Sequence, residues 1–230
     1  MHKNQNATHT FDTPAPVTAR LDIPAGQIRL IAADRVDTTV EVLPTNAAKS
    51  RDIKAAEEIT VTYGDGILRI ETPEAKNRIL GNSGSVQVTV QLPVGSRVEA
   101  KTAAAELRST GRLGDVTFEG AQATVDLDEA ADTRLTLQAG DVSVGRLTGP
   151  AEVSTQNGDI RITQALQGTV TLRTQHGNIT IGAAHSVSAT LDADTAYGRI
   201  HNTLNNSAGA AAGLNIHATT SHGDITAQSL

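Results

Sequence analysis

The residues with the clearest potential for chemistry follow a small residue, usually glycine, that recurs in the second half of the chain. They are Glu106, Thr124, Asp141, Asp159, Asn178, Arg199 and Asp224. A column of carboxylates can bind calcium, as the glycine-aspartate repeats of secreted parallel β-rolls do. Those repeats have paired glycines and a nine-residue period, which this chain lacks, and Arg199 would place a cation in the row of ions. We therefore predict solvated turn residues and no metal site.

Histidines offer a second route to a metal. His176 and His222 each precede a recurring glycine, but by the order of the copies they lie two coils apart, about 10 Å at the spacing of neighbouring strands. One zinc ion needs nitrogen ligands at about 2.1 Å, so this pair is too far apart to share one. His185, His201 and His217 fall in other columns, and no HExxH spacing is present. Surface histidines are the better interpretation.

Catalysis would need several acids with a basic residue on one surface, as in enzymes that act on polysaccharides. The candidates are Asp126, Asp141, Asp159, Arg161 and Arg173, and they form no unusual cluster in the sequence. No nucleophile motif, phosphate loop or dinucleotide fingerprint is present. We predict no catalytic, cofactor-binding or metal-binding residues, no cofactor, and a protein that is not an enzyme.

Composition narrows the partners and the kind of core. The 230 residues carry 19 basic and 25 acidic side chains, and this net charge of −6 argues against nucleic acid as a partner. Aromatic residues make up 2% of the chain, so its core has to come from Val, Ile, Leu and Ala. Cysteine is absent, which excludes disulfides and thiolate metal sites.

The sequence shows neither an apolar leader at the N-terminus nor a run long enough to span a membrane. A cytoplasmic location is the expectation, and a surface location would need a non-standard route.

The elements that would position these residues follow a repeat. Its anchors are Ala105, Ala123, Gly140, Gly158, Gly177, Gly198 and Gly223, separated by 18, 17, 18, 19, 21 and 25 residues. "TQNGDIRI" and "TQHGNITI" are two copies of it. Two residues after each anchor the side chain is aliphatic, and apolar residues also stand five and mostly seven positions before it. Polar residues alternate with these positions, which is the period of half-buried strands.

Two architectures fit this pattern. Asn157-Gly158 between alternating strands is typical of a hairpin, so an antiparallel β meander or sandwich stays open. Aligned columns at a near-constant period instead favour coils stacked on one another, because one copy cannot bury its apolar face alone. We predict an all-β fold, a β-solenoid (β-helix-like) of about seven short coils with an N-terminal β-rich capping region.

The domain plan follows from where the period begins. We predict a disordered N-terminus over 1–10, a β-rich capping region over 11–97 and β-solenoid repeats over 98–230. Residues 63–66 read as a hairpin turn, 45–58 as a helical turn or loop, and 73–85 as a polar connection. An open solenoid end exposes unpaired backbone. Either the loop at 202–215 therefore shields the last coil, or two molecules meet there.

The order of these segments carries a family resemblance. The runs "TARLDIPAGQIRLIAADRVDTTVEVLP", "EEITVTYGDGILRIETP" and "GSVQVTVQLPVGSRVEA", with the later "NGDIRI" and "TTSHGDITAQSL", resemble the actinobacterial branch of the β-strand-repeat "putative adhesin" domains of unknown function. The resemblance covers residues 10 to 230. It implies a repetitive β-helix-like fold without established enzymatic activity, and no functional residue can be carried over. The chain departs from the pattern at Ala105 and Ala123, where the glycine turn is lost.

Three functions are compatible with this reading. The first is a non-catalytic, adhesin-like scaffold that binds a protein partner or itself through a sheet face or edge. The second is a carbohydrate- or cell-envelope-binding module, which would stack exposed aromatics on sugars, but only Phe11, Tyr63, Phe118 and Tyr197 are available. A polysaccharide-acting enzyme ranks last.

Overall fold

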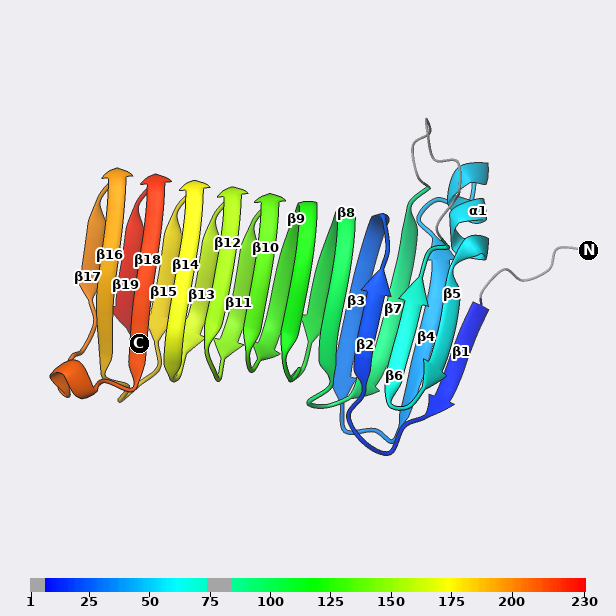
Figure 1. The fold of residues 1–230 in the computed structure, drawn as a ribbon, viewed down its shortest axis with the longest axis horizontal. Coiled ribbons are helices and arrows are strands. Elements are labelled where there is room, and N and C mark those ends of the chain that lie inside the picture. Colours follow the sequence, from blue (N-terminus) through cyan, green and yellow to red (C-terminus); the bar gives the residue numbers. More distant parts are fainter. Residues whose placement is uncertain (1–6, 74–83) are drawn as a thin grey trace, which may run out of the picture.

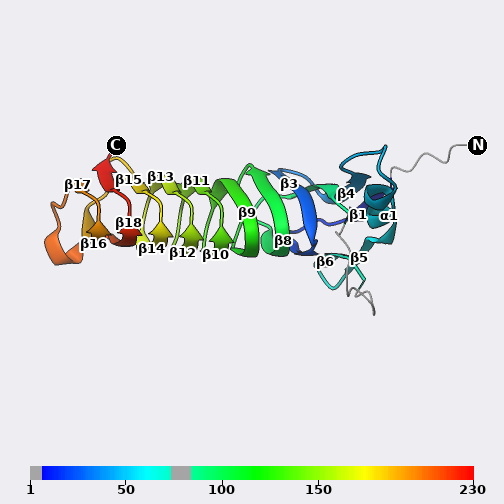
Figure 2. The same ribbon diagram turned by 90° about the horizontal axis from the view of Figure 1, so that it is seen from above.

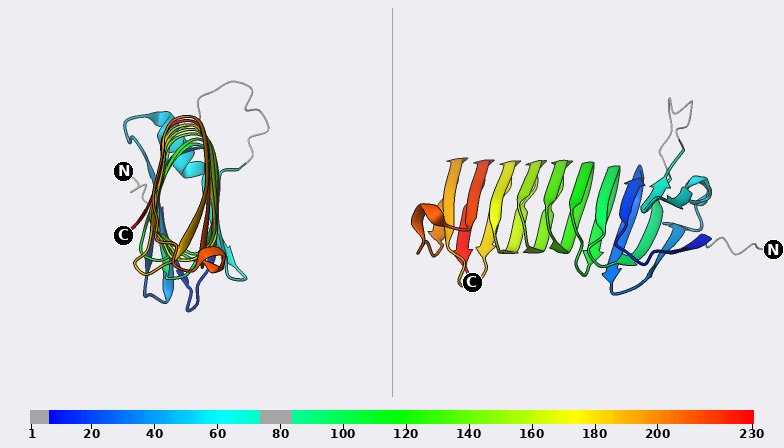
Figure 3. Two further views of the ribbon diagram at one scale, coloured as in Figure 1. Left: turned by 90° about the vertical axis from the view of Figure 1, so that its left-hand side faces the viewer. Right: turned by 60° about the horizontal axis from the view of Figure 1, so that its bottom comes forward.

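The computed structural model describes residues 7–73 and 84–230, and shows an all-β chain drawn out into a long, narrow stack of strands (Figure 1). Viewed from the end, the stack has two sheet layers that enclose a narrow interior (Figure 3). We use "coil" for a unit of two strands, one in each layer, joined by a corner. The alternation of apolar and polar residues explains the layers, because successive side chains of a strand point to opposite faces.

The first layer contains the strand that opens each coil. Its strands are β2 (Thr18–Asp22), β6 (Ile67–Glu71), the first half of β8 (Arg97–Thr110), the first half of β9 (Val116–Ala130), β10 (Thr133–Ala139), β12 (Ala151–Asn157), β14 (Gly168–His176), β16 (Ala189–Tyr197) and β18 (Leu214–His222). The strands β8 and β9 run through the corner without a break, at Ala105 and Ala123, where the recurring glycine is missing.

The second layer contains the strand that closes each coil. Its strands are β3 (Ala25–Ala33), β7 (Val86–Pro93), the second halves of β8 and β9, β11 (Val142–Leu147), β13 (Ile160–Ala165), β15 (Ile179–Ala183), β17 (Ile200–Thr203) and β19 (Ile225–Ser229). Neighbouring coils pair in parallel in both layers, for example β12 with β14 and β13 with β15. This parallel register does not fit the antiparallel meander. The expected number of about seven coils stays a prediction.

The coils are not stacked in sequence order at the C-terminal end. Strand β18 pairs with β14 on one side and β16 on the other, and β19 likewise lies between β15 and β17. The last coil of the chain (β18 and β19) therefore lies between the coil of β14 and β15 and the coil of β16 and β17. Figure 1 shows it as red strands between yellow and orange ones. Stacking in sequence order would place Ile160, Ile179 and Ile200 on successive coils, but Ile200 pairs with Ile225 instead of Ile179.

The same insertion occurs at the N-terminal end. Strands β2 and β3 lie between β8 on one side and β6 with β7 on the other, although β6 and β7 follow them in the chain. Both ends of the stack are thus formed by coils that are not terminal in the sequence. A period in the sequence identifies the coils but does not determine which of them are neighbours.

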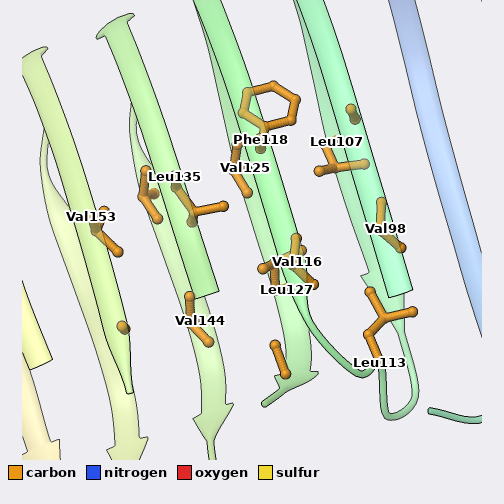
Figure 4. Close-up of a cluster of buried hydrophobic side chains, with 14 of the residues drawn as sticks. Val98, Leu107, Leu113, Val116, Phe118, Val125, Leu127, Leu135, Val144 and Val153 are labelled. Atoms are coloured by element: carbon orange, nitrogen blue, oxygen red, sulfur yellow. The ribbon is translucent and has the colours of Figure 1, made fainter. Parts of the chain in front are cut away.

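Side chains of the aliphatic columns fill the interior. In the column two residues after the anchor, Leu107 pairs with Val125, Val142 with Ile160, and Ile179 with Ile225. These residues belong to one hydrophobic core that runs from the N-terminal strands to β19. Figure 4 shows part of it around Phe118, Val125 and Leu135. The proposed boundary between 11–97 and 98–230 stays a prediction, since strands on both sides share this core.

Antiparallel strands close the N-terminal end. Strand β4 (Asp37–Pro44) pairs with β7, β1 (Ala7–Asp12) pairs with β4, and β5 (Thr60–Gly64) forms a hairpin with β6. The expectation of disorder over 1–10 is wrong for residues 7–10, because the β4 edge offers them a ladder of hydrogen bonds; residues 1–6 lie outside the described range.

The connections in this region follow the sequence. The hairpin turn at 63–66 is confirmed, with positive φ at Asp65 and Gly66. A helix, α1 (Ser50–Glu58), lies within 45–58, so the helical alternative is correct there. Most of the connection at 73–85 lies outside the described residues. Figure 2 shows α1 at the end of the stack opposite β16.

The loop after β17 covers only part of the C-terminal end. It carries a short helix, η1 (Gly209–Ala211), near the lower end of β16 (Figure 3). Its backbone is attached there, since Ala189 donates its N–H to the Asn205 carbonyl at 3.0 Å and Ala208 donates to the Ser188 hydroxyl at 3.0 Å. The loop thus shields the start of β16 and leaves most of the two outermost strands uncovered.

Candidate functional site

The recurring glycine brings the corners of adjacent coils into close contact. A Cβ atom at Gly158 would lie 2.1 Å from the Gly140 carbonyl oxygen, and one at Gly177 would lie 2.0 Å from the Gly158 oxygen. Both glycines also have a φ near +150°, which L side chains rarely adopt. Only glycine therefore fits, and the small residue sets how closely the coils approach at this edge.

Threonine hydroxyls form hydrogen bonds across these closely spaced corners. Thr174 donates its hydroxyl to the Gly158 carbonyl at 3.0 Å, and Thr220 donates to the Gly177 carbonyl at 3.0 Å. In the outermost coil Thr195 donates to the Gly223 carbonyl at 3.0 Å. In each of these bonds the acceptor is the glycine carbonyl of the neighbouring coil. Thr102, in a copy without the glycine, has no hydrogen-bond partner among the described residues.

The column after the glycine forms a second ladder. The backbone N–H of Asp159 donates to the Asp141 carboxylate at 2.8 Å, and that of Asn178 donates to the Asp159 carboxylate at 2.7 Å. The Asn178 side-chain oxygen accepts from the Asp224 N–H at 2.9 Å, and the Asp224 carboxylate accepts from the Arg199 N–H at 2.8 Å. We call this series the Asx ladder. The predicted solvated turn residues are exposed or partly exposed at the corners, and their oxygens in addition bind the backbone of the next coil, which the sequence did not predict.

The Asx ladder ends in a cation. Arg199 occupies the outermost coil, and its guanidinium lies 3.3 Å from the Asp224 carboxylate. Hydrogen bonds and charge from Arg199, the backbone bond first, lower the pKa of Asp224 against a smaller opposing effect of burial. Within residues 7–73 and 84–230, Asp37 is the other carboxyl group with a lowered pKa, and the main cause is the hydrogen bond to Arg35. Both shifts reflect arginine pairs on the surface and indicate no acid–base pair.

A stack of three rings stands beside the Asx ladder. The rings of His176 and His222 are 4.9 Å apart and almost parallel, and Tyr197 stacks on His222 at 4.9 Å. The expected separation of about 10 Å between the histidines is wrong, because the inserted coil brings His222 next to His176. No group of three potential metal ligands occurs within 7–73 and 84–230.

The candidate catalytic residues are distributed over the surface. Arg161 on β13 and Asp126 on β9 lie in the second layer, with Ser143 of the intervening coil between them in register. Arg173 belongs to the first layer, while Asp141 and Asp159 stand in the Asx ladder. The fold therefore does not bring these five side chains together at one point.

The outer surfaces of both layers are polar and bear paired charges. On the first layer Arg20 pairs with Glu99 at 2.8 Å and Arg134 with Glu152 at 3.3 Å, and the His217 Nδ1 lies 3.3 Å from the Asp192 carboxylate. Each contact joins adjacent strands, and each exposed arginine–glutamate pair favours the parallel register by about 0.2–1 kcal/mol. Neither helix of the described chain is long and apolar enough to cross a bilayer.

The outermost coil is the least covered part of the stack. Ile200 is 46% exposed and Tyr197 is 71% exposed, while Leu191 and Ala193, which point inward, are only partly buried. Equivalent positions in the next coil, such as Ala218 and Ile225, are fully buried. No described strand pairs with the outer edges of β16 and β17. The sequence predicted an open end but placed it on the wrong coil.

The lowered pKa of Asp224 leads to a prediction on pH. A carboxyl group with a depressed folded-state pKa stabilises the fold above its unfolded pKa, about 3.9 for Asp, and this contribution is lost as the pH falls through the folded value. We expect the Arg199 amide to lose hydrogen-exchange protection when the pH is lowered from about 5 to below 3. Asp224→Asn should keep an acceptor, as Asn178 does, and should not show this loss. Equal losses in both proteins would contradict the role of Asp224.

Comparisons with known proteins place the chain in a broader group. A model of the Toastrack DUF4097 family matches residues 21–228. A solved "putative adhesin" from Bacteroides fragilis is 13% identical, with a TM-score of 0.49 and coverage of 98% of this chain and 98% of that chain.

Two further solved structures are similar at the same level. A "putative cell adhesion protein" from Clostridium sporogenes is 11% identical, with a TM-score of 0.45 and coverage of 98% and 100%. A "putative lipid binding protein" from Parabacteroides distasonis is 10% identical, with a TM-score of 0.42 and coverage of 97% and 97%. No curated protein matches the chain. At these identities and TM-scores the likeness says nothing about what this chain does.

Proposed function

Because the chain belongs to the Toastrack DUF4097 family of domains of unknown function, we propose that it is a non-catalytic, adhesin-like scaffold that presents its sheet layers to a protein partner. On this proposal a β-solenoid of about seven coils holds the layers rigid. The observation that supports the scaffold proposal most is that the polar corner residues form hydrogen bonds to neighbouring coils. Their oxygens accept backbone amides from neighbouring coils, so they serve the stack and leave few groups free for chemistry.

The shape and charge of the layers support a protein partner. Paired charges on adjacent strands, such as Arg134 with Glu152, make a broad patterned surface. Flat extended surfaces of stacked repeats are commonly used for protein binding. The formal charge of −6 supports a partner other than nucleic acid. The cytoplasmic location expected from the N-terminal composition is part of this proposal and can be tested by cell fractionation.

Two charge-swapped variants test the scaffold function. In the first, Arg134→Glu is combined with Glu152→Arg, and in the second, Arg20→Glu is combined with Glu99→Arg. Each swap keeps an ion pair while it reverses the charge pattern at one place on the first layer. We expect the unmodified chain to capture one stoichiometric partner, and at least one swap to abolish capture without loss of thermal stability. Capture that survives both swaps and equivalent swaps on the second layer would contradict binding through the layers.

A carbohydrate- or envelope-binding module is the second candidate. One observation favours it: Tyr197 ends the ring stack with one face against His222, and its side chain is largely exposed. Phe118 is fully buried, and Tyr63 packs against Phe11 at 5.4 Å, so neither is available as a platform. A specific signal on a glycan array that disappears in Tyr197→Ala would favour this candidate.

A further inference from the structure

The two ends of the stack are closed differently. At the N-terminal end the antiparallel strands β1, β4 and β5 pair with the coils, and α1 lies beside them. At the C-terminal end β16 and β17 have neighbours on one side only within the described chain. Unpaired edges are sites where another strand can add. The outer strands β1 and β5 of the N-terminal end also have a single partner each within the described chain, but they are antiparallel additions to the coils, whereas at the C-terminal end a coil itself is left uncovered.

The backbone of β16 faces outward at alternate residues. The Ser188 carbonyl accepts from Leu214 of β18, whereas the Ala189 N–H turns the other way, to the loop. Because the peptide groups of a strand alternate in direction, Leu191 and Ala193 also point their N–H and C=O groups away from β18. Their inward side chains are only partly buried. The edge thus offers backbone hydrogen bonds beside uncovered apolar surface.

The corner disfavours a further parallel coil. In every preceding step of the Asx ladder a side-chain oxygen accepts the N–H of the next coil, but Arg199 has donors only. An added parallel coil would meet a guanidinium where it needs an acceptor. Antiparallel strands make no use of this ladder, and they already pair with β6 and β7 at the other end. The occupant that suits this edge is an antiparallel strand.

The charges of the outermost coil select the partner. Its first strand, β16, carries Asp192 and Asp194 on its outer surface, while Arg199 and His201 lie at the corner and on β17. Pairing β16 with β16 of another copy would bring acids together. Pairing β16 with β17 of another copy avoids this and brings the acids toward the end of the other copy that carries Arg199, and a two-fold axis along the strand direction does so twice. Such a contact is self-complementary and closes at two subunits.

We propose that two copies of this chain associate tail to tail, through antiparallel pairing of β16 in one copy with β17 in the other. The half-exposed Ile200 and the partly buried Leu191 of both copies become covered in the contact, and the two stacks continue as one longer stack. This surface is separate from the outer surfaces of the layers, so the dimer presents two sets of them. The inference goes beyond the proposed function, and loss of dimerisation leaves the binding of a partner to the layers unaffected.

Sedimentation equilibrium of the full chain tests the dimer. The contact is small, so we expect dissociation in the micromolar range or weaker and a mass that rises from 23.9 kDa toward twice that value between about 5 and 500 μM. Ala193→Pro removes an outward N–H and should keep the protein at the monomer mass over this range. A constant 23.9 kDa for the unmodified chain, or growth beyond two subunits, would overturn the proposal.

A matched pair of charge reversals locates the contact independently of proline. Asp194→Arg places a second cation near Arg199 of the other copy and should weaken dimerisation about tenfold at low salt. Asp126→Arg makes the same change on β9, far from the end, and should leave dimerisation unchanged. Thermal unfolding of each variant verifies that it is folded. Equal effects of the two reversals, or none from Asp194→Arg, would place any association elsewhere and overturn the proposal.

Discussion

Gly158→Ala should lower the free energy of unfolding by roughly 3 kcal/mol or more. Two effects add in the same direction. The φ of +147° strains any residue with a Cβ, and the new Cβ would lie 2.1 Å from the Gly140 carbonyl oxygen. That oxygen belongs to backbone that is itself held between coils, since Thr155 donates to it. The clash can be relieved only by separating the two corners, which also breaks the threonine bond. Denaturant unfolding of both proteins measures the difference.

The matched control is Gly64→Ala. Gly64 lies in the β5 hairpin, has no positive φ, and nothing lies within 4 Å of the place that an added Cβ would occupy. We expect a change within about 0.5 kcal/mol there. If Gly158→Ala were as mild as Gly64→Ala, the corners would not approach as closely as described, and the recurring glycine would need another explanation.

Phe118→Ala should cost about 3–5 kcal/mol of unfolding free energy. Phe118 is fully buried, and in its column it stands between Ala100 and Leu135 of the adjacent coils. Its ring reaches over Gly120, where an added Cβ would lie 2.8 Å from the ring edge. The two β layers are fixed by their ladders and cannot collapse into the space of a lost ring, so a cavity should remain (Figure 4).

The control for this change is Val36→Ala. Val36 is 66% exposed, so its truncation should change the unfolding free energy by no more than about 0.5 kcal/mol. A loss below about 1 kcal/mol for Phe118→Ala, as for an exposed side chain, would mean that the ring is not enclosed between the layers.

The sequence is sufficient to predict the content of each coil. Aliphatic residues two positions after the anchor identify a buried column, because only a stacked arrangement places Ile160 and Ile179 side by side. The glycine anchors identify the corner for a steric reason that does not depend on the rest of the fold. The hairpin at 63–66 is equally local, since Asp65 and Gly66 are residue types that accept positive φ.

The order of the coils is not local and could not be predicted from the period. All copies have the same columns, so each is compatible with several neighbours. The signals of an outermost coil were present but ambiguous. Arg199 interrupts the acceptors of the Asx ladder, and the step to the next anchor lengthens to allow the chain to pass back to the inner side of β16.

The candidate site could be predicted only in part for a related reason. Asp141 and Asp159 looked like solvated turn residues because a polar residue after a glycine is common in turns. Their hydrogen bonds to backbone N–H groups depend on a neighbour that lies 18 or 19 residues away in the chain. The contact of His176 with His222 was missed because it depends on the insertion of the last coil.

Disulfide trapping measures the coil order directly, because the chain contains no cysteine of its own. Two double variants are compared under mild oxidation: His176→Cys with His222→Cys, and His176→Cys with Tyr197→Cys. The first pair lies on adjacent strands, one spacing of about 4.8 Å apart, within reach of a disulfide. The second pair is separated by β18 and lies about 10 Å apart, beyond that reach. Rapid cross-linking of the first pair alone is the predicted result. Cross-linking of the second pair and not the first would show that the coils stack in sequence order, contradicting the inserted C-terminal coil and the open edge that depends on it.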